Sequence, residues 1–311
     1  MIPATTDMDT PHSAAPCVAT IGFFDGVHRG HKFLIKSVID RAAELGLQSA
    51  VVTFDTHPRL VLNKEFQPRL LTTSEEKRRL IAATGVNRCE MLHFDGQMAS
   101  LSAYDFMKDV LRGSLNVRRL ITGYDNRFGH NRAEGFDDYV RYGRELDIEV
   151  ERAEAFVLNG VNVSSSVVRS FLSAGEVDMA AMCLGYHYRL GGTVVGGYHE
   201  GRKLGFPTAN IDVADKLKLV PEAGVYAVKV SIGDSHELHD GMMNIGTRPT
   251  FDGTETTLEV NIFNFSGDLY GSDVCVTFYR RLREERKFSS VNKLVDQLCR
   301  DRAEAERILA G

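Results

Sequence analysis

The stretch GFFDGVHRGH, residues 22–31, decides the fold of the first half of this chain. The residues before it, CVATI (17–21), form a short apolar run that is typical of a buried strand. The residues after it, KFLIKSVIDRAAELG (32–46), place apolar side chains at helical spacing and end at Gly46. The glycine-rich stretch therefore joins a strand to a helix. Backbone N–H groups at such a helix start favour an anion such as phosphate.

The bulk composition limits the classes of protein to consider. The chain has 311 residues and a formal net charge of −5 at pH 7. This length favours two domains, each large enough for its own core. The negative net charge argues against a general nucleic-acid binder, which usually carries a basic stripe. Anionic small molecules remain possible partners, because a local cluster of Arg, Lys and His is enough to bind them.

The spacing of the cysteines and the length of the apolar runs indicate the cellular compartment of the protein. The five cysteines are odd in number, widely spaced and form no C-x-x-C pair, which argues against a disulfide framework or a structural zinc site. They favour a reducing cytoplasm. Residues 1–15 lack the basic region and apolar run of a signal peptide and are expected to form a flexible tail. No apolar stretch approaches the length that spans a bilayer, so no membrane partner is expected.

The first half, from Pro16 to about Gly185, alternates short apolar runs with helical patterns. The runs that predict strands are SAVVTF (49–54), CEMLHF (89–94), RRLITG (118–123) and LDIEVE (146–151). The helical patterns between them are TSEEKRRLIAATG (73–85), with a cap at Thr73 or Ser74, SAYDFMKDVLRGS (102–114) and FDDYVRYGREL (136–146). Such alternation predicts an α/β fold, with a mostly parallel sheet between two helical layers. Ligands of such sheets bind at the carboxyl ends of the strands.

The second half has a different rhythm. Closely spaced strand-like runs with glycine-rich or polar turns are YRLGGTVVGG (188–197), GVYAVKVSIG (224–233), GMMNIG (241–246), TTLEVNIFNF (256–265) and DVCVTFYRRL (273–282). Many short strands without intervening helices predict a small antiparallel barrel. One long helical pattern, residues 289–311, closes the chain. The change of period places the domain boundary near Leu184 to His187, which gives domains at 16–184 and 185–311.

His28 and His31 are the first candidate catalytic residues. Their i, i+3 spacing at a helix start allows both imidazoles to face one pocket, and Gly30 allows a phosphate or base to approach the backbone. Such a pair stabilises charge on a transferring phosphoryl group without a covalent intermediate. An isolated H-x-x-H is more often a pair of surface histidines. The strand-to-helix context favours the functional interpretation here.

A second candidate anion site lies in SSSVVRSFLSAG (164–175). One of its three leading serines, Ser164 to Ser166, is placed to cap a helix, and Arg169 lies within the first turns. Hydroxyls, free N–H groups and a guanidinium together bind an anion. On its own the motif is equally consistent with an ordinary serine cap and a solvated arginine.

The H-x-G-H-like pair and the later serine–arginine stretch together resemble the nucleotidylyltransferase superfamily. The order of GFFDGVHRGH, TFDTHPR (53–59), GYDNRFGHNR (123–132) and SSSVVRS resembles that of the prokaryotic bifunctional FAD synthetases. Those enzymes carry a riboflavin kinase behind an FMN adenylyltransferase. The second half is similar to that kinase in GRKLGFPTANI (201–211), GVYAV (224–228), NIGTRPTF (244–251), TLEVNIFNF (257–265) and GDLYG (267–271).

For the first half, the resemblance implies a Rossmann-like domain that adenylylates FMN with ATP and releases pyrophosphate. It implies that His28 and His31 bind the ATP phosphates, and that Ser164 and Arg169 hold the departing pyrophosphate. The residues that it implies for the flavin and nucleotide pocket are Gly22, Phe23, Asp25, Gly30, Asp55, His57 and Asp125. Thr56 stands where many members have a proline, which leaves the rigidity of that turn open.

For the second half, the resemblance implies a kinase site around PTAN. Thr208 and Asn210 are two residues apart, so an extended backbone points both side chains the same way. Their oxygens suit an ATP-bound Mg²⁺, a role that the resemblance assigns to them. Gly201, Lys203 and Gly205 then belong to a loop that covers the ATP phosphates. Without PTAN beside it, GRKLG predicts only a hairpin turn.

Glu259 is the candidate general base of the kinase. In TTLEVNIFNF, apolar residues alternate with Glu259 and Asn261, which predicts one apolar and one polar face of a strand. A carboxylate on the polar face can take the proton from the riboflavin 5′-hydroxyl. Exposed strand glutamates are common, and it is the resemblance that assigns the catalytic role. For Arg248 in NIGTRPTF, a functional and a structural role both stay open.

The sequence thus predicts a cytoplasmic enzyme that converts riboflavin to FMN and FMN to FAD, with ATP and Mg²⁺ in both steps. One alternative is another adenylyl- or cytidylyltransferase fused to a barrel, against which PTAN and the Glu259 strand argue. Another is a flavin-binding or regulatory protein that has lost one activity, against which the intact candidate residues of both halves argue. Direct nucleic-acid binding calls for a basic recognition helix, and the sequence predicts none.

Overall fold

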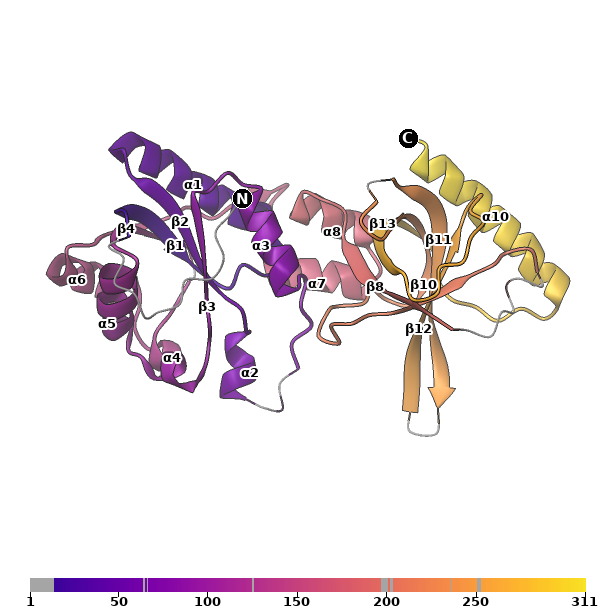
Figure 1. The fold of residues 1–311 in the computed structure, drawn as a ribbon, viewed down its shortest axis with the longest axis horizontal. Helices are drawn as coiled ribbons and strands as arrows, with labels where there is room; N and C mark the ends of the chain where they lie inside the picture. The colour runs from indigo at the N-terminus through magenta and orange to yellow at the C-terminus, as the bar shows by residue number, and fades with distance from the viewer. Residues whose placement is uncertain are drawn as a thin grey trace. The chain divides into compact units, whose positions relative to one another are not determined.

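The computed structural model describes residues 14–63, 65, 67–124, 126–196, 201, 204–235, 237–250 and 253–311. The chain divides into two compact units, Met1–Ser164 and Ser165–Gly311 (Figure 1). The helices α7 (Ser165–Ser173) and α8 (Val177–Leu184) belong to the second unit, in which α8 packs against a barrel strand. The change of period along the sequence predicts a later boundary, near Leu184 to His187, and that domain boundary stays a prediction.

A five-stranded sheet forms the centre of the first unit, in the order β3-β2-β1-β4-β5 (Figure 1). Its strands are β1 (Cys17–Ile21), β2 (Gln48–Phe54), β3 (Arg88–Leu92), β4 (Val117–Thr122) and β5 (Glu149–Arg152). All pairings are parallel, which confirms the expected α/β sheet. The strand order reverses between β1 and β4, and such a reversal opens a crevice at the carboxyl ends of the strands.

Helices cover both faces of this sheet, because the β1 side chains alternate between two cores. Val18 packs on one face with α1 (Arg29–Leu45) and α3 (Ser74–Ala82). Ala19 packs on the other face with residues of the segment 103–148. That segment holds α5 (Ala103–Asp105), η2 (Phe106–Ser114) and α6 (Phe136–Leu146). The short elements of the unit are α2 (Pro58–Leu62), α4 (Gly96–Ser100), η1 (Asp25–Val27), η3 (His130–Arg132), β6 (Val157–Leu158) and β7 (Val161–Asn162).

The ends of α1 and α3 follow from their sequences. Gly46 ends α1 in the left-handed region, at φ 65°, and its N–H donates to carbonyls of the last turn. Thr73 caps α3, so of the two expected caps the threonine is used. Its hydroxyl accepts from the Glu76 N–H while the Glu76 carboxylate accepts from the Thr73 N–H. This reciprocal capping box satisfies two N–H groups that a helix start leaves unpaired.

The pattern SAYDFMKDVLRGS predicts an ordinary helix, but residues Phe106–Ser114 form a π-helix. The Leu115 N–H donates to the Val110 carbonyl, five residues back. The wider turn brings two pairs of residues four apart, Phe106 with Val110 and Met107 with Leu111, onto one buried face. The α and π patterns place apolar residues at nearly the same spacing, so the sequence does not separate them.

A closed antiparallel barrel forms the second unit, in the order β10-β11-β12-β9-β8-β13. Its strands are β8 (Arg189–Val195), β9 (Ala209–Asp212), β10 (Gly224–Ile232), β11 (His239–Thr250), β12 (Gly253–Ile262) and β13 (Asp273–Arg283). The expected barrel is confirmed. The short strand β9, which lies within PTANID, has no separate signal in the sequence because it has only four residues.

The closing helix α10 (Val291–Leu309) begins at the Ser290 cap and covers the outside of the barrel (Figure 1). Its Ala305 and Leu309 pack on Val225 and Met242 of the barrel strands. Its Asp301, only 3% exposed, accepts hydrogen bonds from the Arg283 guanidinium of β13 at 2.9 Å. A buried pair of this kind fixes the helix in one position, because neither charge is stable there without the other.

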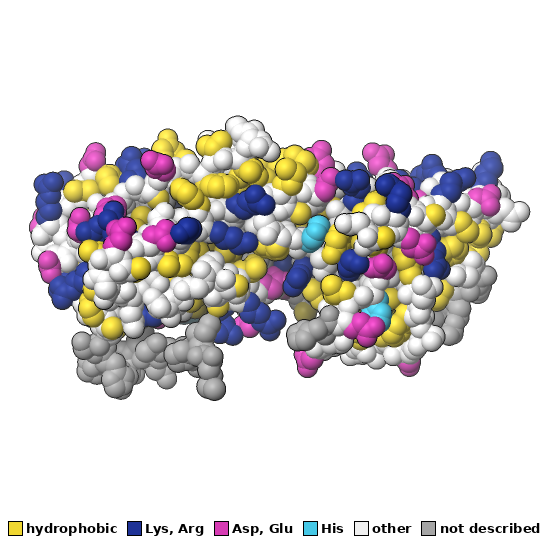
Figure 2. Space-filling view, turned by 90° about the horizontal axis from the view of Figure 1, so that it is seen from above, with side chains coloured by type: hydrophobic (Ala, Val, Ile, Leu, Met, Phe, Trp, Pro, Cys, Tyr) yellow, Lys and Arg dark blue, Asp and Glu magenta, His cyan; other side chains and the backbone are white. Residues whose placement is uncertain are grey.

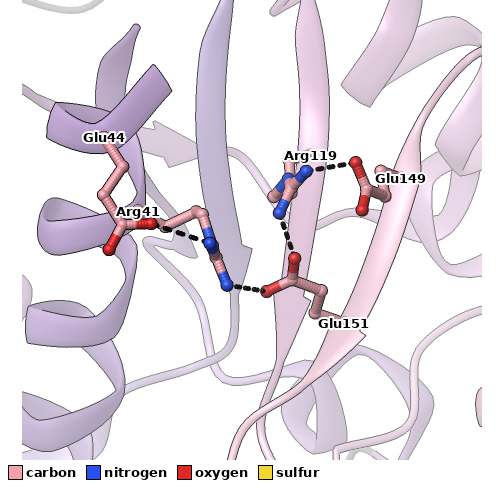
Figure 3. A network of polar contacts seen from close by, with 5 residues as sticks. All are labelled: Arg41, Glu44, Arg119, Glu149 and Glu151. Carbon is pink, nitrogen blue, oxygen red and sulfur yellow. Dashed lines mark hydrogen bonds and ion pairs between the residues drawn. The ribbon is translucent and has the colours of Figure 1, made fainter. Parts of the chain in front are cut away.

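The edge of the parallel sheet carries a network of charges (Figure 3). Arg119 of β4 binds both Glu149 and Glu151 of the edge strand β5. Arg41 of α1 binds Glu44 at 2.7 Å and reaches Glu151 at 3.6 Å. The network connects the edge strand to its neighbour and to the helix that covers that face.

Acidic and basic side chains are interspersed on the face that Figure 2 shows of each unit. Single exposed pairs such as Lys36–Asp40 contribute little to stability. Among the described residues, the structure holds no helix whose length and apolar character suit a membrane crossing. None of the five cysteines forms a disulfide.

Candidate active sites

The GFFDG turn after β1 carries unusual backbone conformations. Phe24, Gly26 and Val27 all lie in the left-handed region, with φ of 53°, 78° and 36°. For a residue other than glycine such a conformation costs roughly 1–3 kcal/mol and persists only where the surroundings enforce it. Phe24 is 3% exposed and Val27 is fully buried, so core packing holds both. The turn that precedes the histidine pair is therefore held in place by tertiary contacts.

Asp25 anchors this turn from inside. Its carboxylate, 3% exposed, accepts hydrogen bonds from the N–H groups of Leu71 and Thr72 and from the Thr72 hydroxyl. The Thr72 hydroxyl oxygen in turn accepts from the Gly26 N–H at 3.1 Å. These contacts join the turn to the segment before α3. They give Asp25 a structural role, and its predicted place in the substrate pocket stays a prediction.

His28 and His31 stack on each other at the start of α1. Their ring centroids lie 3.6 Å apart with the planes 19° from parallel. His28 is the N-cap residue, and its Nδ1 accepts from the His31 N–H at 3.3 Å. Because Nδ1 is an acceptor, a neutral His28 carries its proton on Nε2. The structure thus brings the two predicted histidines together at a helix start, as the sequence indicates.

The electrostatics of the site favour a neutral His31 ring. Burial, with the charges of His28 and Lys77, holds the pKa of His31 well below its ordinary value of 6.5. The buried His31 Nδ1 has no hydrogen-bond partner among the described residues. At Gly30, a Cβ would lie 3.0 Å from the Val163 carbonyl oxygen and 3.2 Å from the His28 ring. Packing inside the protein therefore calls for a glycine here, whether or not a ligand approaches its backbone.

Phe23 and His57 meet between the ends of β1 and β2. Their rings are in edge contact, with centroids 4.6 Å apart. His57 also caps α2, because its Nδ1 accepts from the Arg59 N–H at 3.1 Å. The Phe23 carbonyl accepts from the Thr53 hydroxyl at 3.1 Å. Two predicted pocket residues thus form one aromatic wall at the carboxyl ends of neighbouring strands.

Asp55 lies directly after β2 and turns toward β3. It accepts from the Phe94 N–H at 3.3 Å, and it contacts His93 Nδ1 at 2.8 Å. Burial raises the pKa of Asp55, but hydrogen bonds from His93, Phe94 and Thr56 outweigh it and leave the pKa below its ordinary value. The same contact raises the pKa of His93. These bonds and the His57 cap order the turn in which Thr56 replaces a proline.

A cavity of about 290 Å³ opens at the carboxyl ends of β4 and β5. Its lining residues are Thr122, Gly123, Tyr124, Asn126, Arg127, Gly135, Phe136 and Arg152. The Arg152 guanidinium lies 4.1 Å from the centroid of the Phe136 ring. A planar, cationic and aromatic lining of this kind suits an anionic ligand that also has a flat ring.

Three contacts hold the loop that follows β4, and residues of this loop line the cavity. The Asn126 amide donates to the Ile21 carbonyl at the end of β1. Phe128 stacks on Tyr139, with ring centroids 4.2 Å apart. Gly129, at φ 91°, leaves no room for a Cβ, which would lie 2.6 Å from the Ala103 nitrogen. The predicted site residue Asp125 lies in this loop and outside the described residues.

The serine–arginine motif lies at the start of α7. Ser164 directly precedes the helix and Arg169 lies in its second turn. The predicted helix is confirmed. The anion-binding roles of Ser164 and Arg169, like those of the other candidate residues, stay predictions.

In the barrel, three predicted residues share one surface. Asn210 of β9 lies directly opposite Glu259 of β12 in the ladder. Cross-strand partners project to the same side of a sheet, and Thr208, two residues from Asn210, reaches Glu259 with its hydroxyl at 3.5 Å. Asn244 of β11 is the partner of Glu259 on the other side. The sequence pattern predicts no role for Asn244. Its position as the first residue of NIGTRPTF gives no signal until the register is known.

Asn261 does not lie on an exposed polar face, contrary to the predicted pattern. It is 5% exposed, and its amide donates to the Pro207 carbonyl at 2.6 Å. The segment before β9 covers this part of β12, and a strand pattern alone does not reveal such a cover. Glu259 itself is partly exposed.

The described residues of GRKLGF, Gly201 and 204–206, close a turn before PTAN. The Leu204 and Phe206 N–H groups both donate to the Gly201 carbonyl, at 3.1 and 2.9 Å. A Cβ at Gly201 would lie 2.3 Å from the Phe206 carbonyl oxygen, and Gly205 adopts φ 80°. Glycine is needed at both positions for the turn itself. Lys203 and the side chain of Arg248 lie outside the described residues.

The oxygens gathered here suit a hard cation. Thr208 offers a hydroxyl, Asn210 an amide and Glu259 a carboxylate, which are the ligand types that Mg²⁺ takes alongside water and phosphate. In the described part of the chain, no three His, Cys, Asp or Glu side chains come together as a metal site. The donor set therefore fits a metal that is carried in by a phosphate-bearing substrate.

Comparison with known proteins identifies a family for each half of the chain. The FAD synthetase family matches residues 10–167, and the riboflavin kinase family matches residues 184–309. The chain is 40% identical to a bifunctional riboflavin kinase/FMN adenylyltransferase of Pseudomonas fluorescens over 94% of this chain and 93% of the relative. It is 36% identical to the protein of that description from Escherichia coli K12, over 92% and 90%.

A solved structure covers the same length. The fold matches a Streptococcus pneumoniae protein described as a macrolide-efflux protein, with a TM-score of 0.87, 32% identity and 96% coverage of both chains. The two family matches cover the two halves of the chain in turn, and the curated relatives extend over almost its whole length. The chain therefore belongs to the family of bifunctional riboflavin kinase/FMN adenylyltransferases.

Proposed function

We propose that the chain carries out the two reactions of its family at two separate sites. The second unit phosphorylates riboflavin to FMN, and the first unit adenylylates FMN to FAD and releases pyrophosphate. The observation that carries this proposal is that the principal candidate residues of each step lie together within one unit. The stacked His28 and His31 lie in the first unit, and Thr208, Asn210 and Glu259 lie in the second.

In the adenylyltransferase step, the histidine pair donates hydrogen bonds to the ATP phosphates. A neutral His31 ring suits this role, because it carries one N–H donor whose hydrogen bond strengthens as charge develops on the reacting phosphate. The start of α1 adds its free N–H groups. Phe23 and His57 form the wall beside the flavin, and Ser164 and Arg169 hold the pyrophosphate that leaves. Gly22, Gly30, Asp55 and Asp125 complete the pocket in this proposal.

In the kinase step, Glu259 accepts the proton of the riboflavin 5′-hydroxyl as that oxygen attacks the γ-phosphate of ATP. Thr208 and Asn210 hold the Mg²⁺ that accompanies ATP, and the metal supplies charge neutralisation on the phosphates when bound. The turn around Gly201, Lys203 and Gly205 covers those phosphates. No covalent protein intermediate is needed, because positioning and charge stabilisation carry the transfer.

The proposal includes the cellular setting. The substrates are riboflavin, FMN and ATP, and no nucleic acid or membrane takes part. A cytoplasmic location suits cysteines that form no disulfide and the use of ATP.

Chromatography of flavins tests the function directly. The intact protein is incubated with riboflavin, ATP and Mg²⁺, and the products are followed in time. We expect FMN first and FAD afterwards. FMN without FAD contradicts the adenylyltransferase assignment, and unchanged riboflavin with unconverted added FMN contradicts both and favours a flavin-binding protein.

A further inference from the structure

Lys77 is a buried lysine beside the candidate site of the first unit, with no role in the function described so far. It lies on α3 and is only 1% exposed. Its ammonium donates to the Phe54 carbonyl, the last residue of β2, at 2.6 Å. It also lies 3.8 Å from the centroid of the Phe23 ring. One cation thus contacts the residue that ends β2 and the aromatic residue that follows β1.

Burial of this charge is costly for the fold. An ammonium removed from water is stable only with strong compensating contacts, and an apolar side chain of similar volume often serves stability as well or better. Lys77 occupies a buried position on the face of α3 that also carries Ile81, and methionine is an apolar side chain of similar length. Packing alone therefore does not explain a lysine here, and its contacts with Phe23 and Phe54 need another reason.

Those contacts lead to the candidate substrate wall. Phe23 is held from one side by the Lys77 cation and contacts His57 with its ring, at 4.6 Å between centroids. Its backbone carbonyl is fixed by the Thr53 hydroxyl. A cation over an aromatic face is attracted more strongly when it is shielded from water, and such a contact favours one ring orientation.

We propose that Lys77 is a positioning residue for the adenylyltransferase step. It fixes Phe23 and the end of β2 so that Phe23 and His57 present a rigid wall to the flavin ring of FMN. The proposal rests on the proposed function of the first unit. Lys77 acts through Phe23 and does not itself touch the reacting phosphates.

The charge of Lys77 provides a readout that a purely structural lysine lacks. Burial lowers the pKa of Lys77 to about 8, against the raising effect of Asp25, Cys89 and Asp55. The groups that face it are Asp25 from η1, Asp55 after β2, Cys89 from β3 and His31 from α1. Burial raises the pKa of Cys89 to about 11 and lowers that of His31, so neither changes its charge between pH 7 and 9.

The experiment measures KM for FMN and kcat of FAD formation in the full chain between pH 7 and 9. In the wild type, KM for FMN rises above pH 8, because neutral Lys77 no longer holds the Phe23 ring. Lys77→Met raises KM for FMN at least about tenfold at pH 7 and removes the rise with pH. Lys77→Arg keeps the cation at every pH, so its KM stays flat from pH 7 to 9. Arg78→Met, at the exposed next position of α3, behaves as the wild type.

The outcomes separate the possibilities. A structural role predicts that Lys77→Met lowers kcat with the folded fraction and leaves KM unchanged, which overturns the proposal. A flat wild-type profile, or a Lys77→Arg profile that rises like the wild type, also overturns it, even where Lys77→Met does not fold. If the wild type forms no FAD at any pH, the proposed function of this unit fails instead.

Discussion

The candidate site of the first unit lies on a turn, whereas that of the second unit lies on the ladder of a closed barrel. In the first, His28 and His31 follow residues with left-handed backbone, and buried neighbours such as Asp25 hold the turn. In the second, Asn210 and Glu259 are ladder partners on adjacent strands. The geometry of the turn site therefore depends on a few buried groups that hold the turn. The geometry of the barrel site depends instead on the strand register, which decides the residues that lie opposite each other.

The largest effect is expected at Glu259. Replacement by glutamine keeps the size of the side chain and removes the base, so riboflavin phosphorylation falls by about 10²–10⁴. Conversion of added FMN to FAD stays at the wild-type rate, because that site lies in the other unit. Separate assays of the two steps check this. If the folded variant lost both activities, the two sites would not act independently, and the prediction would be wrong.

A slightly smaller effect is expected at His31. His31→Ala removes one donor to the reacting phosphates and lowers FAD formation by about 10²–10³. FMN formation from riboflavin is unchanged, which the same pair of assays shows. Full FAD formation by this variant contradicts the role of the histidine pair.

Stability is the next point of contrast. Asp301→Ala leaves the partly buried Arg283 without its partner and destabilises the barrel by about 3 kcal/mol. Asp25→Ala leaves the Leu71 and Thr72 N–H groups without acceptors and destabilises the first unit by about 1–3 kcal/mol. Residual activity after heating measures both. Asp301→Ala is expected to lose the kinase at a temperature where adenylylation survives, and Asp25→Ala the reverse. If either variant loses both activities at the same temperature, the two units do not unfold independently and the prediction is wrong.

The smallest effect concerns acid. The folded chain holds the pKa of His31 below 6.5, whereas the unfolded chain takes up a proton near that pH. The unfolded state therefore binds more protons below pH 6.5, and the free energy of unfolding falls as the pH falls. Between pH 7.5 and 5.5 the loss from this residue is about 1 kcal/mol. Denaturant unfolding of the wild type and His31→Gln measures it, and an equal acid loss in both contradicts the buried neutral ring.

Much of the fold is predictable from the sequence, because the alternation of runs and helical patterns differs between the two halves. The parallel sheet, the barrel and the closing helix all follow from that difference. The π-helix at Phe106–Ser114 does not, because its apolar spacing nearly equals that of an α-helix. The buried position of Asn261 depends on a segment more than fifty residues away in the chain.

The candidate sites follow the same rule. His28 with His31, and Thr208 with Glu259, are brought together as their motifs indicate, because each motif fixes a local backbone geometry. Lys77 is not predictable, since SEEKRRL has the composition of a solvated helix face and only the fold places its lysine inside. The motif GFFDG places Asp25 in the turn after β1. Its hydrogen bonds to the backbone near Leu71, a segment distant in sequence, are seen only in the structure.

The charged residues on the edge strand of the parallel sheet affect how readily the chain associates with other copies of itself. A closed barrel has no free edge, but an open sheet has two, and each offers unpaired backbone groups to any strand that approaches. Glu149 and Glu151 stand on one such edge strand and are bound to arginines of their own unit. A second β5 brought alongside would meet like charges, so this edge resists the strand-to-strand contact from which aggregates grow.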